Sequence, residues 1–130
     1  MTNEFSNFLS IYTEEERKAK IQKEHRRIKK ILKTLKGEKQ IAVEKLICEA
    51  AFLAVTLEET RLIINRDGII ELYQNGANQS GKKKSSAVEV YDKLLNVYIK
   101  VVKQLCDSLP DPQEQNPAEE IMAFVTGIQK

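Results

Sequence analysis

The residues best able to do chemistry are a run of cations near the start of the chain. The segment from Arg17 to Lys39 holds eleven Lys or Arg against two Glu, a net charge of +9, although the whole chain carries only +2. The remaining residues therefore carry a net −7. On a helix, Ile21, Ile28 and Leu35 would form an apolar stripe with most of the cations on the opposite side. The candidate anion-binding residues are Lys23, Arg26, Arg27, Lys29, Lys30 and Lys33.

The charge pattern of this segment favours an anionic partner. Solvated helix faces usually mix signs, so that Glu and Lys pair four residues apart. Here Lys23/Arg27 and Arg26/Lys30 are like-charged pairs at that spacing, and each pair costs about 0.2–0.5 kcal/mol. Nucleic acid is the favoured partner and a merely solvated face is the alternative. A membrane surface ranks last because the apolar stripe lacks Trp and Phe anchors. The spacing predicts contact with phosphates, not readout of bases.

A second group of cations, Lys82, Lys83 and Lys84, follows a polar stretch over residues 75–81. The stretch resembles a GxxxxGK[ST] phosphate loop, but Lys83 stands where a hydroxyl would bind Mg²⁺, and no strand is expected before it. We therefore expect no nucleotide site. Three cations in a polar loop could touch a phosphate backbone, and a purely solubilising loop fits the same residues equally well.

The sequence gives no sign of catalysis, of a metal site or of a cofactor. Cys48 and Cys106 lie far apart in apolar patterns, and we expect both as small buried hydrophobes in a reducing compartment. His25 has no partner at a ligand-like spacing, so a zinc site is not expected. Glu58 and Glu59 are interpreted as exposed residues. No paired titratable groups suggest an enzyme.

Helix signals organise most of the chain, so we predict an all-α fold. A capping box at Thr13 and Glu16 starts a long basic helix that should end near Lys36, before Gly37. Further helices are expected over residues 41–65 and 86–109, joined as an antiparallel hairpin, and Pro110 ends the second of them. Residues 69–73 read as one or two helical turns, and residues 75–86 as a loop. The predicted divisions are 1–40, 41–110 and 111–130.

Two of these segments carry apolar surface whose partner the sequence leaves open. The helix over 41–65 is apolar around more than half of its circumference, which indicates either the core of the protein or a subunit interface. A short C-terminal helix should begin at Asn116 and Pro117. The polar linker over 111–115 leaves open that this tail does not pack on the body. The apolar patch of the tail consists of Ile121, Met122, Phe124 and Val125.

An ordered series of motifs adds a resemblance to a known family. The series consists of AFLAVTLEE at 51–59, ELYQNG at 71–76, GKKKS at 81–85, Tyr91, and KQLCDSLP at 103–110. In these residues the chain resembles the small terminase subunit of tailed bacteriophages. That resemblance implies a non-catalytic DNA-packaging protein that forms a homo-oligomeric ring and binds double-stranded viral DNA at the packaging-start site. It also implies recruitment or regulation of the large terminase subunit, which owns the ATPase and nuclease.

The resemblance also assigns roles to the predicted elements. The hairpin over 41–110 would build the ring, the basic helix would contact DNA, and the C-terminal patch would be a candidate docking site for the large subunit. Many family members carry a separate helix-turn-helix domain, whereas before Ile41 we expect only a single long helix, so sequence-specific reading of the major groove is not expected. Specificity would then arise weakly in each subunit and be multiplied by avidity.

Two other classes of protein fit the same residues. One is a dimeric DNA-binding regulator, and the other is a structural helical adaptor without a nucleic-acid role. Residues 1–9 lack the features of a signal peptide, and no apolar run approaches the roughly 18 residues of a membrane span. We therefore expect a soluble protein of the host cell cytoplasm with no membrane partner.

Overall fold

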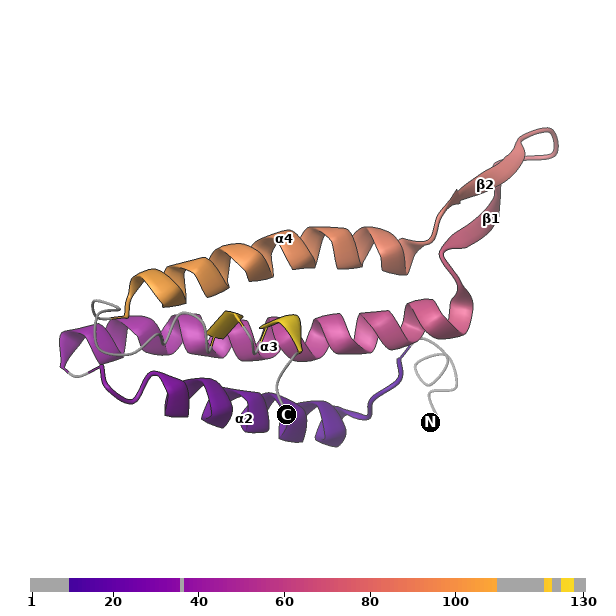
Figure 1. The fold of residues 1–130 in the computed structure, drawn as a ribbon. Helices are drawn as coiled ribbons and strands as arrows, with labels where there is room; N and C mark the ends of the chain where they lie inside the picture. Colours follow the sequence, from indigo (N-terminus) through magenta and orange to yellow (C-terminus); the bar gives the residue numbers. More distant parts are fainter. Residues whose placement is uncertain (1–9, 36, 110–120, 123–124, 128–130) are drawn as a thin grey trace.

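The computed structural model describes residues 10–35, 37–109, 121–122 and 125–127 of the 130. Its elements are α2 (Glu14–Ile31), α3 (Glu38–Asp67), β1 (Ile70–Gln74), β2 (Ser80–Lys84) and α4 (Ser86–Asp107). The long α3 lies between α2 and α4, and both run antiparallel to it (Figure 1). The mostly helical fold and the antiparallel α3–α4 hairpin are confirmed, but a purely all-α fold is not, because β1 and β2 form a small antiparallel sheet.

The start of α2 is the predicted capping box. The Glu16 backbone N–H donates to Thr13 Oγ1 at 3.1 Å, and the Thr13 N–H donates to Glu16 Oε1 at 3.2 Å. The helix ends at Ile31, earlier than the predicted end near Lys36. Leu32 and Leu35 are both buried in the turn that follows, so the chain bends where these side chains enter the core.

The central helix α3 contributes more residues to the core cluster than any other helix or strand of the described chain. Ala50 and Ala51 are almost fully buried, and these small side chains let the neighbouring helices approach closely. Leu105 of α4 and Ile28 of α2 belong to the same buried cluster. The chain therefore supplies partners for α3 from its own α2 and α4, which establishes the core role among the two that the sequence left open.

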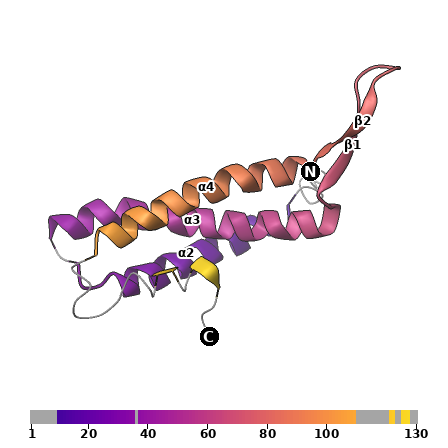
Figure 2. The same ribbon diagram turned by 45° about the horizontal axis from the view of Figure 1, so that its top comes forward.

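The β-hairpin extends beyond the helices, as the two ribbon views agree (Figures 1 and 2). Its register pairs Ile70 with Lys84 and Gln74 with Ser80. The predicted helical turns over 69–73 are thus wrong, and part of the predicted loop over 75–86 is a strand. The cause is visible in β2, whose sequence SGKKK has no apolar alternation and becomes a strand only by pairing with the β-favouring residues of β1.

One glycine of the hairpin is required by close packing. A Cβ at Gly81 would lie 3.1 Å from the ring of Tyr73, its partner across the sheet. The tyrosine ring therefore covers the strand where a side chain would otherwise stand, an arrangement that stabilises glycine positions in sheets.

The described part of the C-terminal tail contacts the body. Ile121 is only 4% exposed and belongs to the core cluster, and Val125 packs against it. A tail that stays off the body is therefore wrong for these residues. Met122 is half-exposed, at 50%, while Phe124 lies outside the described residues. The expected burial of both cysteines is also wrong, because Cys48 is exposed and Cys106 only partly buried.

None of the helices in the described ranges has the length and apolar character needed to cross a membrane.

Candidate nucleic-acid interface

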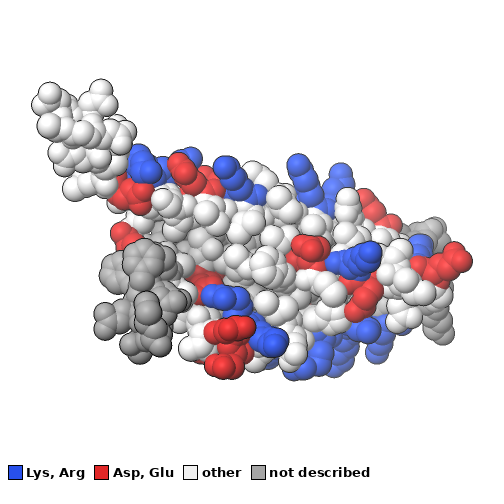
Figure 3. Space-filling view, turned by 180° about the vertical axis from the view of Figure 1, so that it is seen from behind, with Lys and Arg blue, Asp and Glu red and all other residues white. Residues whose placement is uncertain are grey.

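The outer side of α2 and of the turn after it carries a row of exposed cations. Lys23, Arg26, Lys30 and Lys33 are spaced by three and four residues and form no ion pair within the part of the chain that the structure describes. Lys23, Arg26 and Lys30 therefore follow one side of α2 over about 10 Å, and Lys33 continues the row in the turn after it. Figure 3 shows basic side chains gathered along the lower right edge of the molecule, where the C-terminal half of α2 lies. We call these four residues the cationic row.

The other two predicted anion-binding residues of α2 are engaged with carboxylates. Arg27 Nη1 donates to Glu24 Oε1 at 3.1 Å, and Lys29 Nζ lies 3.8 Å from Glu44 Oε2. These contacts are partly exposed and therefore weak, but they reduce the charge that each side chain offers to a ligand. The six cations expected to act together are thus divided into a row of four and two flanking residues.

Two of the three cations in the first half of α2, Arg17 and Lys20, pair with carboxylates of α3 instead. Arg17 pairs with Glu59 at 2.9 Å, and Lys20 Nζ lies 3.3 Å from Glu58 Oε1 and 4.8 Å from the ring centre of Tyr12. The first turn of the helix is acidic and consists of Glu14, Glu15 and Glu16. The second half of α2 is therefore the more favourable half for an anionic ligand.

A buried carboxylate anchors the start of α2 to the far end of α3. Glu59 is 7% exposed and accepts the backbone N–H groups of Ile11 at 3.0 Å and Tyr12 at 2.9 Å, together with both Nε and Nη2 of Arg17. Burial by itself would raise the pKa of Glu59, but the donated hydrogen bonds and the guanidinium outweigh it, so the pKa lies below its usual range. The interpretation of Glu59 as exposed is therefore wrong.

The neighbouring Tyr12 is held at the same point. Its hydroxyl donates to Glu58, which is exposed as expected. Burial and this bond raise the pKa of Tyr12 well above its usual range, so the phenol stays protonated and remains a donor. The row of cations is thus carried by a helix whose entry is fixed by several polar contacts.

The second predicted group of cations lies in β2, not in a loop. Successive side chains of a strand point to opposite faces, so Lys82 and Lys84 lie on one face of the hairpin and Lys83 on the other. Lys83 pairs with Glu71 at 3.2 Å and Lys84 with Asp92 at 3.6 Å. In the described residues only Lys82 of the three has no ion pair, so the hairpin does not present a joint cationic surface.

The structure also changes the reason for rejecting a phosphate loop. A strand does precede the glycine-containing stretch, because β1 ends at Gln74. Gly81 and Lys82, however, belong to the paired strand β2, whereas a phosphate loop leads into a helix whose N-terminus meets the ligand. The stretch therefore lacks the geometry of a nucleotide site.

A hollow of about 250 Å³ lies between the three helices and is lined by Glu24, Arg27, Arg61, Tyr91 and Tyr98 among others. Burial raises the pKa of Glu24 despite the opposing effect of Arg27, and burial raises the pKa of Tyr98 to about 12. A carboxyl group with a raised pKa is a feature of general acids, but no Ser, Cys or Lys nucleophile is among the described lining residues. The absence of catalytic function stays a prediction.

Comparison of the chain with protein-family models, with curated proteins and with solved structures found no match. The functional interpretation therefore rests on the residues and their geometry.

Two features escaped the sequence interpretation. The Glu59 anchor joins residues 42 to 48 positions apart, and no local spacing announces it. His25 of α2 is bonded to Glu44 of α3, and Glu44 and Cys48 are four residues apart. That last spacing places Glu44 and Cys48 on one side of a helix, but it does not predict that His25 lies opposite them.

Proposed function

We propose that this chain is a non-catalytic small terminase subunit of a tailed bacteriophage. In this role it assembles with copies of itself, binds double-stranded viral DNA at the packaging-start site, and recruits or regulates the large terminase subunit. Two independent observations support this proposal: the ordered motifs between residues 51 and 110, and the cationic row on α2 and the turn after it.

The cationic row is the observation that carries the DNA-binding part. Lys23, Arg26, Lys30 and Lys33 are exposed, without ion pairs among the described residues, and held on one side of an anchored element. Cations arranged in this way neutralise phosphates and release the counterions bound to DNA, which is the main source of sequence-independent affinity. Like-charged neighbours on a helix are unfavourable without an anion, so a phosphate backbone accounts for both their presence and their exposure.

Exposed apolar side chains support self-association. Val90 and Val97 of α4, seven residues apart and each 46% exposed, lie on one side of that helix, and Ile99 is 52% exposed. On α3, Phe52 is 48% exposed. Because α2 and α4 already cover the buried residues of α3, the oligomer in this proposal forms through the outer side of α4 together with exposed residues of α3 such as Phe52.

The C-terminal patch keeps a reduced role in contact with the large subunit. Ile121 is part of the chain's own core, so it is not free for docking unless the tail detaches. Met122 is exposed and adaptable in shape, and it is the described residue of the patch that a partner would reach first.

The deciding experiment combines oligomeric state with DNA binding. We expect light scattering after size exclusion to give an assembly larger than a dimer. We expect its affinity for duplex DNA to fall with salt, with a logarithmic slope of about −0.9 for each phosphate contact. A dimer that binds DNA would instead indicate a regulator, and an assembly that binds no DNA at low salt would indicate a structural adaptor. Capture of the purified large terminase subunit by the full chain tests the remaining part of the proposal.

A further inference from the structure

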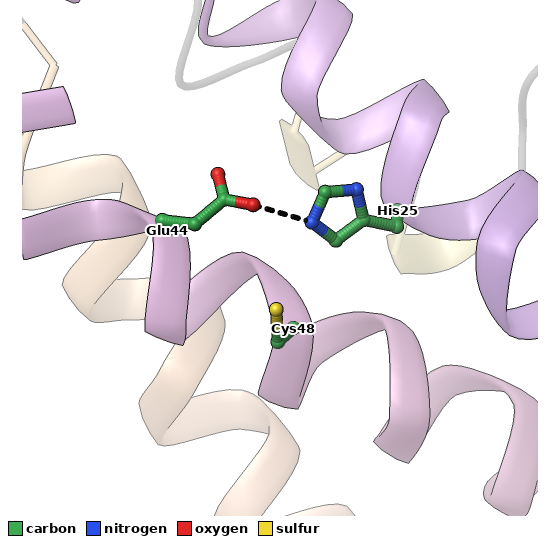
Figure 4. Close-up of side chains that lie close together, drawn as sticks. All are labelled: His25, Glu44 and Cys48. Carbon is green, nitrogen blue, oxygen red and sulfur yellow. Dashed lines mark hydrogen bonds and ion pairs between the residues drawn. The ribbon is translucent and has the colours of Figure 1, made fainter. Parts of the chain in front are cut away.

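Three side chains of different chemistry meet where α2 passes α3. They are His25 of α2 and Glu44 and Cys48 of α3, and their ligand atoms all lie within 4.8 Å of one another. Figure 4 shows the imidazole directed at the Glu44 carboxylate, with the Cys48 sulfur on the same side of α3. His25 Nε2 and Glu44 Oε1 are 2.8 Å apart.

Two simple features of the fold produce this juxtaposition. Glu44 and Cys48 are four residues apart on α3 and therefore share one side of the helix. The antiparallel course of α2 brings His25, near its middle, opposite that side. The site is also accessible, because Cys48 is exposed and the side chains of His25 and Glu44 are 24% and 38% exposed.

We propose that His25, Glu44 and Cys48 form a binding site for a divalent transition metal ion of the zinc class. Imidazole nitrogen, thiolate sulfur and carboxylate oxygen are the three ligand types that zinc accepts, and three protein ligands leave a fourth tetrahedral position to water. The thiolate and imidazole select against Mg²⁺ and Ca²⁺, which prefer oxygen ligands.

The distances are close to those that coordination requires. At metal–ligand bonds of about 2.0–2.3 Å, tetrahedral ligand atoms lie about 3.3–3.8 Å apart. The pair His25 Nε2 and Glu44 Oε1 is slightly closer than this, and no pair exceeds 4.8 Å. Side-chain rotations that move the ligand atoms by about an ångström are therefore enough for coordination, and neither helix has to move.

The charges also agree with a divalent ion. A Cys48 thiolate and the Glu44 carboxylate together balance the two positive charges of the metal. Lys29 Nζ, 3.8 Å from Glu44 Oε2, is the nearby cation that competes for this carboxylate. The two partners of Glu44 in the metal-free protein, His25 and Lys29, are thus held by weak, partly exposed contacts that an ion can replace.

Such an ion would join α2 to α3 at a second point, distant in the chain from the Glu59 anchor. Binding to the folded state alone stabilises that state in proportion to the logarithm of metal concentration over the dissociation constant. The site shares its helix with the cationic row, but it requires no DNA and no self-association, so its test is independent of the proposed function.

The test is titration of the reduced full chain with Co²⁺, which replaces Zn²⁺ and is visible in absorption. We expect a thiolate-to-cobalt charge-transfer band in the near ultraviolet, tetrahedral d–d bands in the visible range, and loss of both when Zn²⁺ is added. Zn²⁺ should also raise the thermal unfolding midpoint of the wild-type chain.

Single-ligand variants with a matched cysteine control locate the site. Cys48→Ser should abolish the charge-transfer band and the stabilisation by Zn²⁺, whereas Cys106→Ser should keep both. His25→Gln and Glu44→Gln should each raise the dissociation constant by at least about tenfold. Because Cys48 is exposed, its replacement leaves the fold intact, which circular dichroism verifies. The proposal is overturned if the wild-type chain gives no charge-transfer band, or if Cys48→Ser binds Co²⁺ as tightly as the wild type.

Discussion

The chain carries two groups of cations, one on α2 and the turn after it and one on β2, and the two groups differ in spatial arrangement and in ion pairing. The spacing of three and four residues places Lys23, Arg26 and Lys30 on one side of α2, an element fixed to the body, and Lys33 follows in the turn directly after it. On β2 three consecutive lysines alternate between two faces, and two of them pair with carboxylates. Equal charge in the sequence thus becomes a concentrated surface in one region and a dispersed one in the other.

The difference shows that the period of the secondary structure decides what a charge run can do. A helix collects residues three and four apart, whereas a strand separates neighbours. The supports differ as well, because α2 packs into the core along its length while the hairpin extends away from the helices (Figure 1). Under the proposed function we therefore expect changes on α2 to affect DNA binding far more than changes on β2.

The largest expected effect comes from removing the cationic row. In the variant Lys23→Gln, Arg26→Gln, Lys30→Gln and Lys33→Gln, four phosphate contacts are lost, so the logarithmic salt slope should become shallower by about 3.6. At 0.1 M salt this corresponds to a loss of affinity of roughly a few thousandfold for each bound chain. Fluorescence anisotropy on labelled duplex DNA over a range of salt measures both quantities. An unchanged slope would remove α2 as the DNA-contacting element.

The next effect concerns the anchor that fixes α2. Glu59→Gln removes the charge from a buried acceptor of backbone and guanidinium hydrogen bonds, so we expect a loss of about 2 kcal/mol of stability. This corresponds to about thirtyfold in the folding equilibrium. Urea unfolding measures it, with Glu49→Gln, an exposed carboxylate of the same helix, as the control. Equal stability of the two variants would show that the anchor contributes nothing.

The same carboxylate should make stability depend on acid. Because the folded-state pKa of Glu59 is depressed, its contribution is present above the ordinary Glu pKa of about 4.3 and is lost as the pH falls through the lower folded value. The stability difference between the wild type and Glu59→Gln should therefore shrink with acidification. Urea unfolding at a series of pH values measures this difference, and a gap that widens below pH 4.3 would contradict the depressed pKa.

A smaller effect is expected on the hairpin. Replacing Lys82, Lys83 and Lys84 together by Gln removes only one cation that lacks an ion pair in the described residues, so DNA affinity at 0.1 M salt should fall by about tenfold or less. The same anisotropy assay compares this variant directly with the α2 variant. A loss of affinity as large as that of the α2 variant would show that β2 contributes equally to DNA binding, and it would contradict the difference between the two groups of cations.

The smallest effect tests the support of the hairpin itself. In Gly81→Ala the new methyl group meets the ring of Tyr73, which is partly exposed and can swing away. We expect faster amide hydrogen exchange in β1 and β2 and no change in global unfolding, because the hairpin lies outside the core. Ser80→Ala, one residue earlier in β2, serves as the control and should exchange like the wild type.

The sequence predicted the features that depend on local spacing. The Thr13 capping box and the span of α4 follow from side chains a few residues apart, and both are found in the structure. The burial of Glu59 and the contact of His25 with Glu44 depend on how α2 lies along α3, which no local pattern encodes. The strand β2 was missed for the same reason, since its residues become a strand only through the partner across the sheet.

The two-stranded sheet has a consequence for the chain in concentrated solution. In a sheet of two strands, both are edge strands, so each leaves one row of backbone N–H and C=O groups open to pairing with another molecule. Natural sheets block such pairing with charged side chains, lysine above all. Lys82, Lys83 and Lys84 place a charge on both faces of β2, and so they protect the open edge of this strand from unwanted strand addition even where they touch no phosphate.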